Sequence, residues 1–419
     1  MDMSSRLVDT PETHDPSVEI METRAVWVRR VVAAGFLAAL VLAPKLWLND
    51  EFYGPVSILG EWPQLIFPLD WMFFLVIGGL LVPIALSSRW GKWIAIWSAV
   101  VFLRAIWDRM IWQPYFYQYF FMLVLLGWGG EGWPTWRTST RRKRGSRSPA
   151  VSPGVGLNAC RIVMAGIYFW SGISKFNHRF LHGGARHLLL PLCPVWVVEI
   201  IEPFGWGIAL MEVVIGVGMV FSSTRLPAAV MAALMHVGIL LSIGPTGINY
   251  NAVVWPWNIT MIVLLGLLFW RGSDNMTGMA FAPAHRRRSI VATVFFLLLP
   301  GLSYLGFWPY YVSFRLYSGM SRDAWVFVSD DLKQRLPEDV QSELRPVSRG
   351  QLDWRLRLNH WSEGRLGAFA PPERRIYLHV ADRFCQFAEG PHEFGMKINS
   401  QPDFWSGKTQ AELFRCGDL

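Results

Sequence analysis

Long apolar segments separated by short polar connections make up most of the chain, and this pattern stops near residue 307. Nine of these segments are long enough for a transmembrane helix that is tilted or partly buried; they are residues 31–48, 71–88, 93–107, 113–129, 157–175, 206–222, 227–243, 257–270 and 289–307. The pattern predicts an all-α polytopic membrane bundle of about nine transmembrane helices. We divide the chain into a tail at 1–25, a transmembrane domain at 26–307 and a soluble domain at 308–419.

The soluble domain has a different composition, with charged residues and prolines distributed throughout. The runs AWVFVS (324–329) and RIYLHV (375–380) have the short apolar character of strands. The run DDLKQRLPEDVQSEL (330–344) has a partly helical pattern. We therefore expect a small α+β domain after the last membrane helix.

Composition and charge support a membrane protein and predict its orientation. Only 17% of the residues are charged, against about 25% in a soluble domain. Basic residues precede the first segment or separate consecutive ones at Arg29 and Arg30, Arg89 and Lys92, 137–148, Arg225 and 285–288. With nine spans these positions all fall on one side, which the positive-inside rule makes cytoplasmic. We expect a multi-pass protein of the inner or plasma membrane, with a cytoplasmic N-terminus and an extracytoplasmic C-terminal domain.

The basic run at 137–148 contains no acidic residue, so it is also compatible with an anionic-lipid or nucleic-acid patch. We favour a topology-setting cytoplasmic loop and expect no nucleic-acid partner. None of the four cysteines has the spacing of zinc ligands, and no metal site is expected. Cys385 and Cys416 share the soluble domain, where an oxidising compartment would permit a disulfide.

Several polar residues lie in or beside the predicted spans, where facing lipid would be costly. On the predicted topology their positions converge on the outer half of the membrane. We expect one outward-opening cavity with Lys175 and His236 as catalytic candidates, and with Glu212, Asn251, Trp257 and Asn258 as cofactor-binding candidates.

Each of these residues also has a structural interpretation. A lysine at a span end often extends to the interface, a histidine can join two helices by one hydrogen bond, and Glu212 can simply neutralise a cation. A buried amine acts as a base only after losing its proton, and a nearby carboxylate opposes that loss. The sequence leaves this balance open. Arg104 and Asp108, four residues apart, are expected to form a structural ion pair.

The run YFWSGISKFNHRFLHGG (168–184) resembles a Y-F-x-x-G-x-x-K segment of the vitamin K-dependent gamma-carboxylase family, within the horizontally transferred transmembrane (HTTM) group. Residues 205–225, with Glu212, and residues 235–247, with His236, are similar to the next two helices of that family, and residues 108–126 to an earlier one. The resemblance implies that Lys175 is the base that deprotonates a quinol, that His236 borders the pocket, and that the cofactor is a quinone or quinol. The soluble domain is too small for us to infer protein carboxylation.

Three functional hypotheses follow. The first is an enzyme that uses a lysine base on a quinol or another lipophilic substrate in an outward-facing pocket within the membrane. The second is a non-catalytic membrane anchor or export-associated protein. The third is a quinone-linked oxidoreductase subunit of the DoxX type. The first and third require a lipophilic small molecule as well as the lipid bilayer, whereas the second requires only the bilayer.

Overall fold

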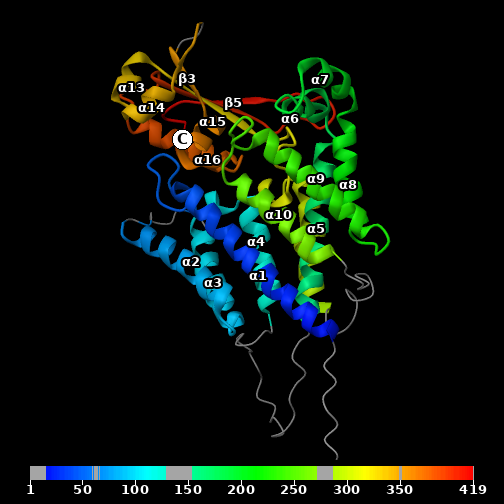
Figure 1. Cartoon of the computed structure of the whole chain (residues 1–419). Helices are drawn as coiled ribbons and strands as arrows, with labels where there is room; N and C mark the ends of the chain where they lie inside the picture. Colours follow the sequence, from blue (N-terminus) through cyan, green and yellow to red (C-terminus); the bar gives the residue numbers. More distant parts are fainter. Residues whose placement is uncertain are drawn as a thin grey trace, which may run out of the picture.

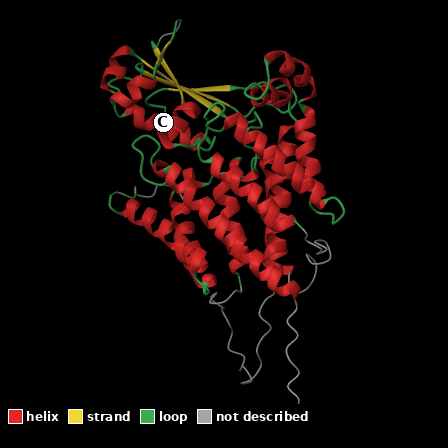
Figure 2. Cartoon of the chain, viewed as in Figure 1, coloured by secondary structure: helices red, strands yellow, loops and turns green. Residues whose placement is uncertain are grey.

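The chain folds into a helical bundle with a small β-sheet at one end (Figures 1 and 2). The computed structural model describes residues 16–58, 60, 65, 67–128, 153–270, 286–348 and 352–418. The basic run at 137–148 lies outside the described residues, and so do most residues of the predicted N-terminal tail.

The first part of the bundle contains a long helix, a helical hairpin and an aromatic helix. Its elements are α1 (Pro16–Leu42), η1 (Pro44–Leu46), α2 (Leu69–Leu86), α3 (Trp90–Trp107), η2 (Arg109–Ile111) and α4 (Pro114–Gly127). α1 packs against α2, α4 and also α5 and α10 from the second part. Arg104 and Asp108 form the expected ion pair at 3.1 Å, and both side chains are buried.

The second part of the bundle holds the helices that surround the candidate site. Its elements are α5 (Pro153–Lys175), η3 (Phe180–Gly184), α6 (Ala185–Leu189), α7 (Val195–Ile201), η4 (Glu202–Phe204), α8 (Trp206–Gly218), α9 (Arg225–Ile243), α10 (Val254–Phe269), α12 (Arg286–Thr293), η5 (Val294–Leu298), η6 (Leu299–Leu305) and η7 (Tyr311–Ser313). α5 packs against α8, α4, α12 and α1, so it lies at the centre of the bundle.

Four stretches of described helix are long and apolar enough to cross a membrane, and five if a bent pair is one span. The four are Val18–Leu42, Leu69–Leu86, Arg225–Ile243 and Arg286–Leu305, and the pair Val195–Phe204 and Trp206–Gly218 is bent by 60°. Val254–Phe269 is apolar but shorter. The prediction of a helical membrane bundle is supported, but the count of nine spans is not confirmed.

Exposed apolar side chains follow one face of α8 and one face of α9. On α9 they are Leu226, Val230, Leu234, Val237 and Leu241. Their spacing of three or four residues places them on a single side of the helix. A continuous exposed apolar stripe of this kind is a surface for lipid rather than water.

The C-terminal domain combines an antiparallel sheet with four short helices. Its elements are β1 (Asp323–Val328), α13 (Asp330–Arg335), α14 (Glu338–Glu343), β2 (Arg345–Pro346), β3 (Trp354–Arg357), α15 (Leu358–Leu366), α16 (Arg374–Cys385), β4 (Phe394–Asn399) and β5 (Ala411–Phe414), with strand order β2-β3-β1-β4-β5. β1 is central, and its alternate residues Ala324, Val326 and Val328 are buried. Cys385 and Cys416 form a disulfide, as predicted.

Two of the three local predictions for this domain are confirmed, and one is wrong. The run at 324–329 forms β1, and 330–344 forms α13 and α14 with Pro337 between them. The run at 375–380 lies in helix α16 instead of a strand. Six residues are too few to distinguish the two periods. Over the whole helix the buried residues recur with helical spacing, at Ile376, Tyr377, Val380, Ala381 and Phe384.

The C-terminal domain docks on the bundle through ion pairs and aromatic contacts. Arg365 pairs with Asp50 at 2.6 Å, and Arg109 pairs with Glu373 at 2.6 Å. The buried ring of Phe52 packs against Trp361 and other rings of the domain. The domain therefore shares its core with the loop that follows η1.

Glycines allow α5 and α8 to approach closely. A Cβ atom on Gly172 of α5 would lie 2.6 Å from the backbone nitrogen of Val213 in α8. A Cβ atom on Gly216 of α8 would lie 2.6 Å from the backbone nitrogen of Phe169 in α5. Small residues at such crossings are the usual way for membrane helices to pack backbone to backbone. The close crossing brings the end of α5 against the middle of α8.

Gly216→Ala is expected to destabilise the protein, because the added methyl group meets the α5 backbone, which cannot rotate away. Overpacking of this kind costs about 1–3 kcal/mol, so the melting temperature of the purified protein in detergent should fall. Gly266→Ala in α10 is the control, since no heavy atom lies within 4 Å of its added Cβ. Equal melting temperatures for the two variants would show that the crossing does not depend on glycine.

Candidate functional site

Lys175, the last residue of α5, forms a buried ion pair with Glu212 of α8. Its Nζ lies 2.7 Å from Oε2 of Glu212. It also lies 2.8 Å from the Ser171 hydroxyl and 3.2 Å from the Ser171 carbonyl oxygen, one turn earlier on α5. An ammonium has three N–H donors, and these three acceptors use all of them. Lys175 therefore points into the bundle and does not extend to the membrane surface.

His236 of α9 is the centre of a hydrogen-bonded chain. Its Nε2 lies 2.6 Å from the hydroxyl oxygen of Tyr168, and its Nδ1 lies 2.6 Å from Oδ1 of Asn258. The amide nitrogen of Asn258 donates to the Val254 carbonyl at 2.7 Å, which turns Oδ1 toward the imidazole. Because Oδ1 only accepts, Nδ1 carries the proton and Nε2 accepts from the tyrosine. The chain is therefore complete with an uncharged imidazole.

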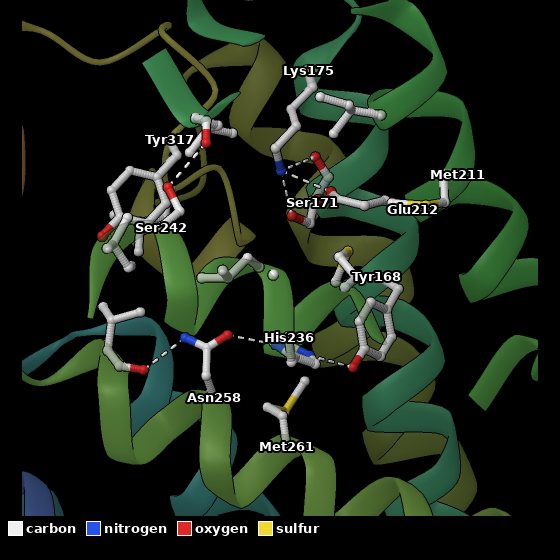
Figure 3. A pocket seen from close by; sticks show the side chains of 18 of the residues that line it. Tyr168, Ser171, Lys175, Met211, Glu212, His236, Ser242, Asn258, Met261 and Tyr317 are labelled. Carbon is white, nitrogen blue, oxygen red and sulfur yellow. Dashed lines mark hydrogen bonds and ion pairs between the residues drawn. The ribbon is translucent and has the colours of Figure 1, made fainter. Parts of the chain in front are cut away.

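A cavity of about 260 Å³ joins these two polar groups (Figure 3). It lies among α5, α8, α9 and α10, and the segment 314–317 closes one side. Apart from the polar groups its walls are apolar, with Ile167, Ile208, Met211, Met235, Ile239, Val254 and Met261 among them. The Lys175 group and the His236 group lie at different levels of the cavity in Figure 3.

The cavity borders the faces of α8 and α9 that carry the exposed apolar stripes. Met211 of α8 and Met235 of α9 line the cavity and are themselves partly exposed. Met211 directly follows the exposed Leu210, and Met235 directly follows the exposed Leu234. This wall of the cavity therefore lies next to the exposed apolar stripes of the two helices.

Five of the six residues predicted for the site line this cavity, and one lies beside it. The five are Lys175, Glu212, His236, Trp257 and Asn258. Trp257 is oriented by a 2.7 Å hydrogen bond from its indole nitrogen to Oε1 of Gln118. Asn251 instead donates to the Tyr317 hydroxyl at 2.9 Å, and its backbone nitrogen donates to Glu363 of the C-terminal domain at 3.0 Å.

Sequence reasoning missed Tyr168, Ser171 and Tyr317 as site residues. Tyr168 and Ser171 precede Lys175 by seven and four residues, so all three lie on one face of α5. That periodicity was available in the sequence. Tyr317 had no such signal, because it follows the last helix of the bundle and reaches the cavity only through the docking of the C-terminal domain.

The site has no features of a metal centre. Within the part of the chain that the structure describes, no group of three or more histidine, cysteine, aspartate or glutamate side chains could hold a metal ion. The polar groups of the cavity instead satisfy one another in pairs and chains.

Glu212→Gln is expected to destabilise the protein more than the removal of both charges does. The single change leaves the ammonium of Lys175 buried without a carboxylate, which costs about 3 kcal/mol. The double variant Lys175→Met with Glu212→Leu removes both charges and should melt at a higher temperature than Glu212→Gln.

The control is the half-exposed pair between Arg374 and Glu412, at 3.1 Å. Glu412→Gln should change stability by less than about 1 kcal/mol, since water compensates the arginine. If Glu212→Gln and Glu412→Gln had equal effects on the melting temperature, the charge of the Lys175 pair would not be buried in the folded protein.

The central segment of the chain is similar to a family of membrane proteins. Residues 154–253 match the family described as methylamine utilisation protein MauE, which is a membrane family. No curated protein and no solved structure matches the chain. The expected kinship with the HTTM group and the gamma-carboxylases is therefore wrong, and the DoxX-type interpretation is not supported. The matched segment includes Lys175, Glu212 and His236. The chain is an integral membrane protein whose central segment is similar to MauE.

Proposed function

We propose that this protein binds an uncharged lipophilic molecule of the quinone or quinol class in the cavity between Lys175 and His236. The observation that carries the proposal is an apolar cavity, bordered by lipid-facing helices, that holds two polar groups at different levels. Most of the surface of a small-molecule site is apolar, and a few polar groups fix the orientation of the ligand. A quinone has this chemistry, with a flat apolar ring and oxygen atoms at opposite edges.

The electrostatics of the cavity favour a ligand without net charge. The ion pair of Lys175 and Glu212 is neutral as a unit, and the chain from Tyr168 through His236 to Asn258 is uncharged. A charged ligand would need a compensating charge in this buried site. A neutral ligand needs only hydrogen bonds, and the hydroxyl of Tyr168 retains lone pairs to accept one.

The same groups provide a route for a proton from a bound hydroxyl. Tyr168 accepts the proton at its oxygen while its own proton passes to Nε2 of His236, and Nδ1–H of the resulting imidazolium stays bonded to Asn258. The imidazolium of His236 then stabilises the ligand oxyanion through Tyr168, because the ammonium of Lys175 is already paired with Glu212. Lys175 becomes a base itself only if its proton first crosses the 2.7 Å contact to Glu212. We therefore assign proton acceptance to His236 and orientation of the ligand to the pair of Lys175 and Glu212.

The proposal includes the nine-span topology, with the N-terminus in the cytoplasm and the cavity on the outer side. Basic residues near one end of the bundle support it. Arg24 donates to the carbonyl of Trp270 at the end of α10, and Arg29 donates to that of Ser87 at the end of α2. The cavity lies toward the other end, where Asn177 donates to the Ser318 carbonyl near the C-terminal domain.

Lipid extraction and mass spectrometry of the purified protein should detect a bound quinone or a related lipophilic molecule. The double variant Lys175→Met with Glu212→Gln removes both charges and the hydrogen-bonding ammonium of Lys175. The amount of ligand bound per protein should therefore fall several-fold. Lys45→Met, which removes an exposed ammonium outside the cavity, should leave it unchanged. Loss of the ligand in both variants, or no ligand in the folded wild type, would favour a bundle that serves only as an anchor.

A reporter enzyme that is active only outside the cytoplasm tests the topology. Fused after Asp418, it should be active, because the C-terminal domain is proposed to be extracytoplasmic. Fused after Lys92, at the start of α3, it should be inactive, because Arg89 and Lys92 are retained in the cytoplasm. The opposite pattern of activities would reverse the orientation.

A further inference from the structure

A second cavity, of about 500 Å³, lies between the end of the bundle and the C-terminal domain. Its charge is strongly unbalanced: one carboxylate, that of Glu373, lines it together with the arginines Arg109, Arg315, Arg322, Arg374 and Arg375. Glu373 is already paired with Arg109 at 2.6 Å and approached by Arg375 at 3.9 Å. Arg374 pairs with Glu412 outside the cavity at 3.1 Å, so Arg315 and Arg322 carry the excess positive charge.

Arg315 is the most buried of these arginines, with 1% of its surface exposed. Its guanidinium lies over the rings of Tyr304 and Tyr310, at 4.4 and 4.9 Å from their centroids. Its Nη1 donates a long hydrogen bond, at 3.4 Å, to the Ser303 carbonyl oxygen. The side-chain amide oxygen of Gln401 is a further acceptor for the guanidinium, but it carries no charge. Among the residues described, Nε of Arg315 has no hydrogen-bond partner and the guanidinium has no carboxylate partner. A buried charge without a counter-ion is costly, so the site is incomplete by itself.

The position of the cavity coincides with the end of a membrane-length helix. The candidate span Arg286–Leu305 ends beside it. Leu305 and Phe307, at this end, have 68% and 77% of their surfaces exposed. Trp308 and Tyr310 follow and line the cavity, and aromatic residues of these types concentrate where hydrocarbon meets headgroups. The arginines thus lie at the level that phosphate groups of lipids occupy.

We propose that this arginine cavity binds a phosphate-type anion, with Arg315 as its buried anchor. Guanidinium groups bind phosphate oxygens in pairs of parallel hydrogen bonds. Arg322, which has no carboxylate partner within the described part of the chain, supplies a second binding group. The anion neutralises the excess charge and links the C-terminal domain to the end of the bundle. It comes either from the headgroup of an anionic phospholipid or from free phosphate.

The thermal stability of the full chain in detergent, measured with added ligands, tests this site and separates the two sources. Phosphatidylglycerol should raise the melting temperature, and phosphatidylcholine, which has no net charge, should raise it much less. Stabilisation by phosphatidylglycerol without stabilisation by inorganic phosphate assigns the site to a lipid headgroup. Equal stabilisation by inorganic phosphate assigns it to the free anion.

Three arginine variants locate the effect. Arg315→Gln and Arg322→Gln should each raise the ligand concentration needed for half of the stabilisation about tenfold, the loss of one charge-assisted hydrogen bond. Arg322→Gln serves if Arg315→Gln does not fold, because Arg322 is only partly buried. Arg345→Gln removes an equal charge from exposed strand β2 and should have no effect. No stabilisation by either anion, or an equal loss in Arg345→Gln, would overturn the proposal.

Discussion

The buried ion pair between Lys175 and Glu212 is the interaction on which the arrangement of the site depends. Neither charge could be buried alone, because the desolvation of a single ion in an apolar bundle exceeds what its other contacts return. The two charges must therefore be held within hydrogen-bond distance. The close crossing of α5 and α8 at Gly172 and Gly216 provides that geometry. Glycines several residues away on the same helices thus determine whether a lysine at the end of α5 can enter the membrane core.

A pair of this kind also explains why the cavity is apolar overall despite its polar residues. Ser171 and Glu212 use the donors of Lys175, and Asn258 and Tyr168 use both nitrogens of His236. The polar side chains of these two groups thus have their partners on the wall of the cavity. The proposed ligand would therefore meet mostly apolar walls and a few oriented polar groups.

The sequence predicted the elements that depend on local pattern and failed where tertiary contacts decide. Long apolar segments identify the bundle, and alternation over 324–329 identifies β1, because the buried face of each is written into its own residues. Residues 375–380 were misread because the helical period of α16 becomes visible only over a longer stretch. Two of its buried residues, Ala381 and Phe384, lie outside the six-residue run. The resemblance to the carboxylases rested on short spaced motifs, which similar membrane helices can share without common function.

The candidate site shows the same division. Lys175, Glu212 and His236 could be brought together by reasoning from helix order and from the cost of polar groups in lipid. Tyr317 could not, because it reaches the cavity from a segment after the bundle. Asn251 was placed by its loop alone, whereas in the structure its contacts with Tyr317 and Glu363 tie that loop to the C-terminal domain.

The segment 314–317 connects the two cavities physically. Phe314, Leu316 and Tyr317 line the cavity of Lys175, while Arg315 lines the arginine cavity. Phe314 and Tyr317 both have positive φ, at 57° and 60°, a conformation that large side chains adopt only where surrounding contacts hold it. Arg315, fixed between two tyrosine rings, supplies such contacts. A ligand on Arg315 would therefore stabilise the same segment that closes the Lys175 cavity, so the two proposed ligands would act on one shared wall.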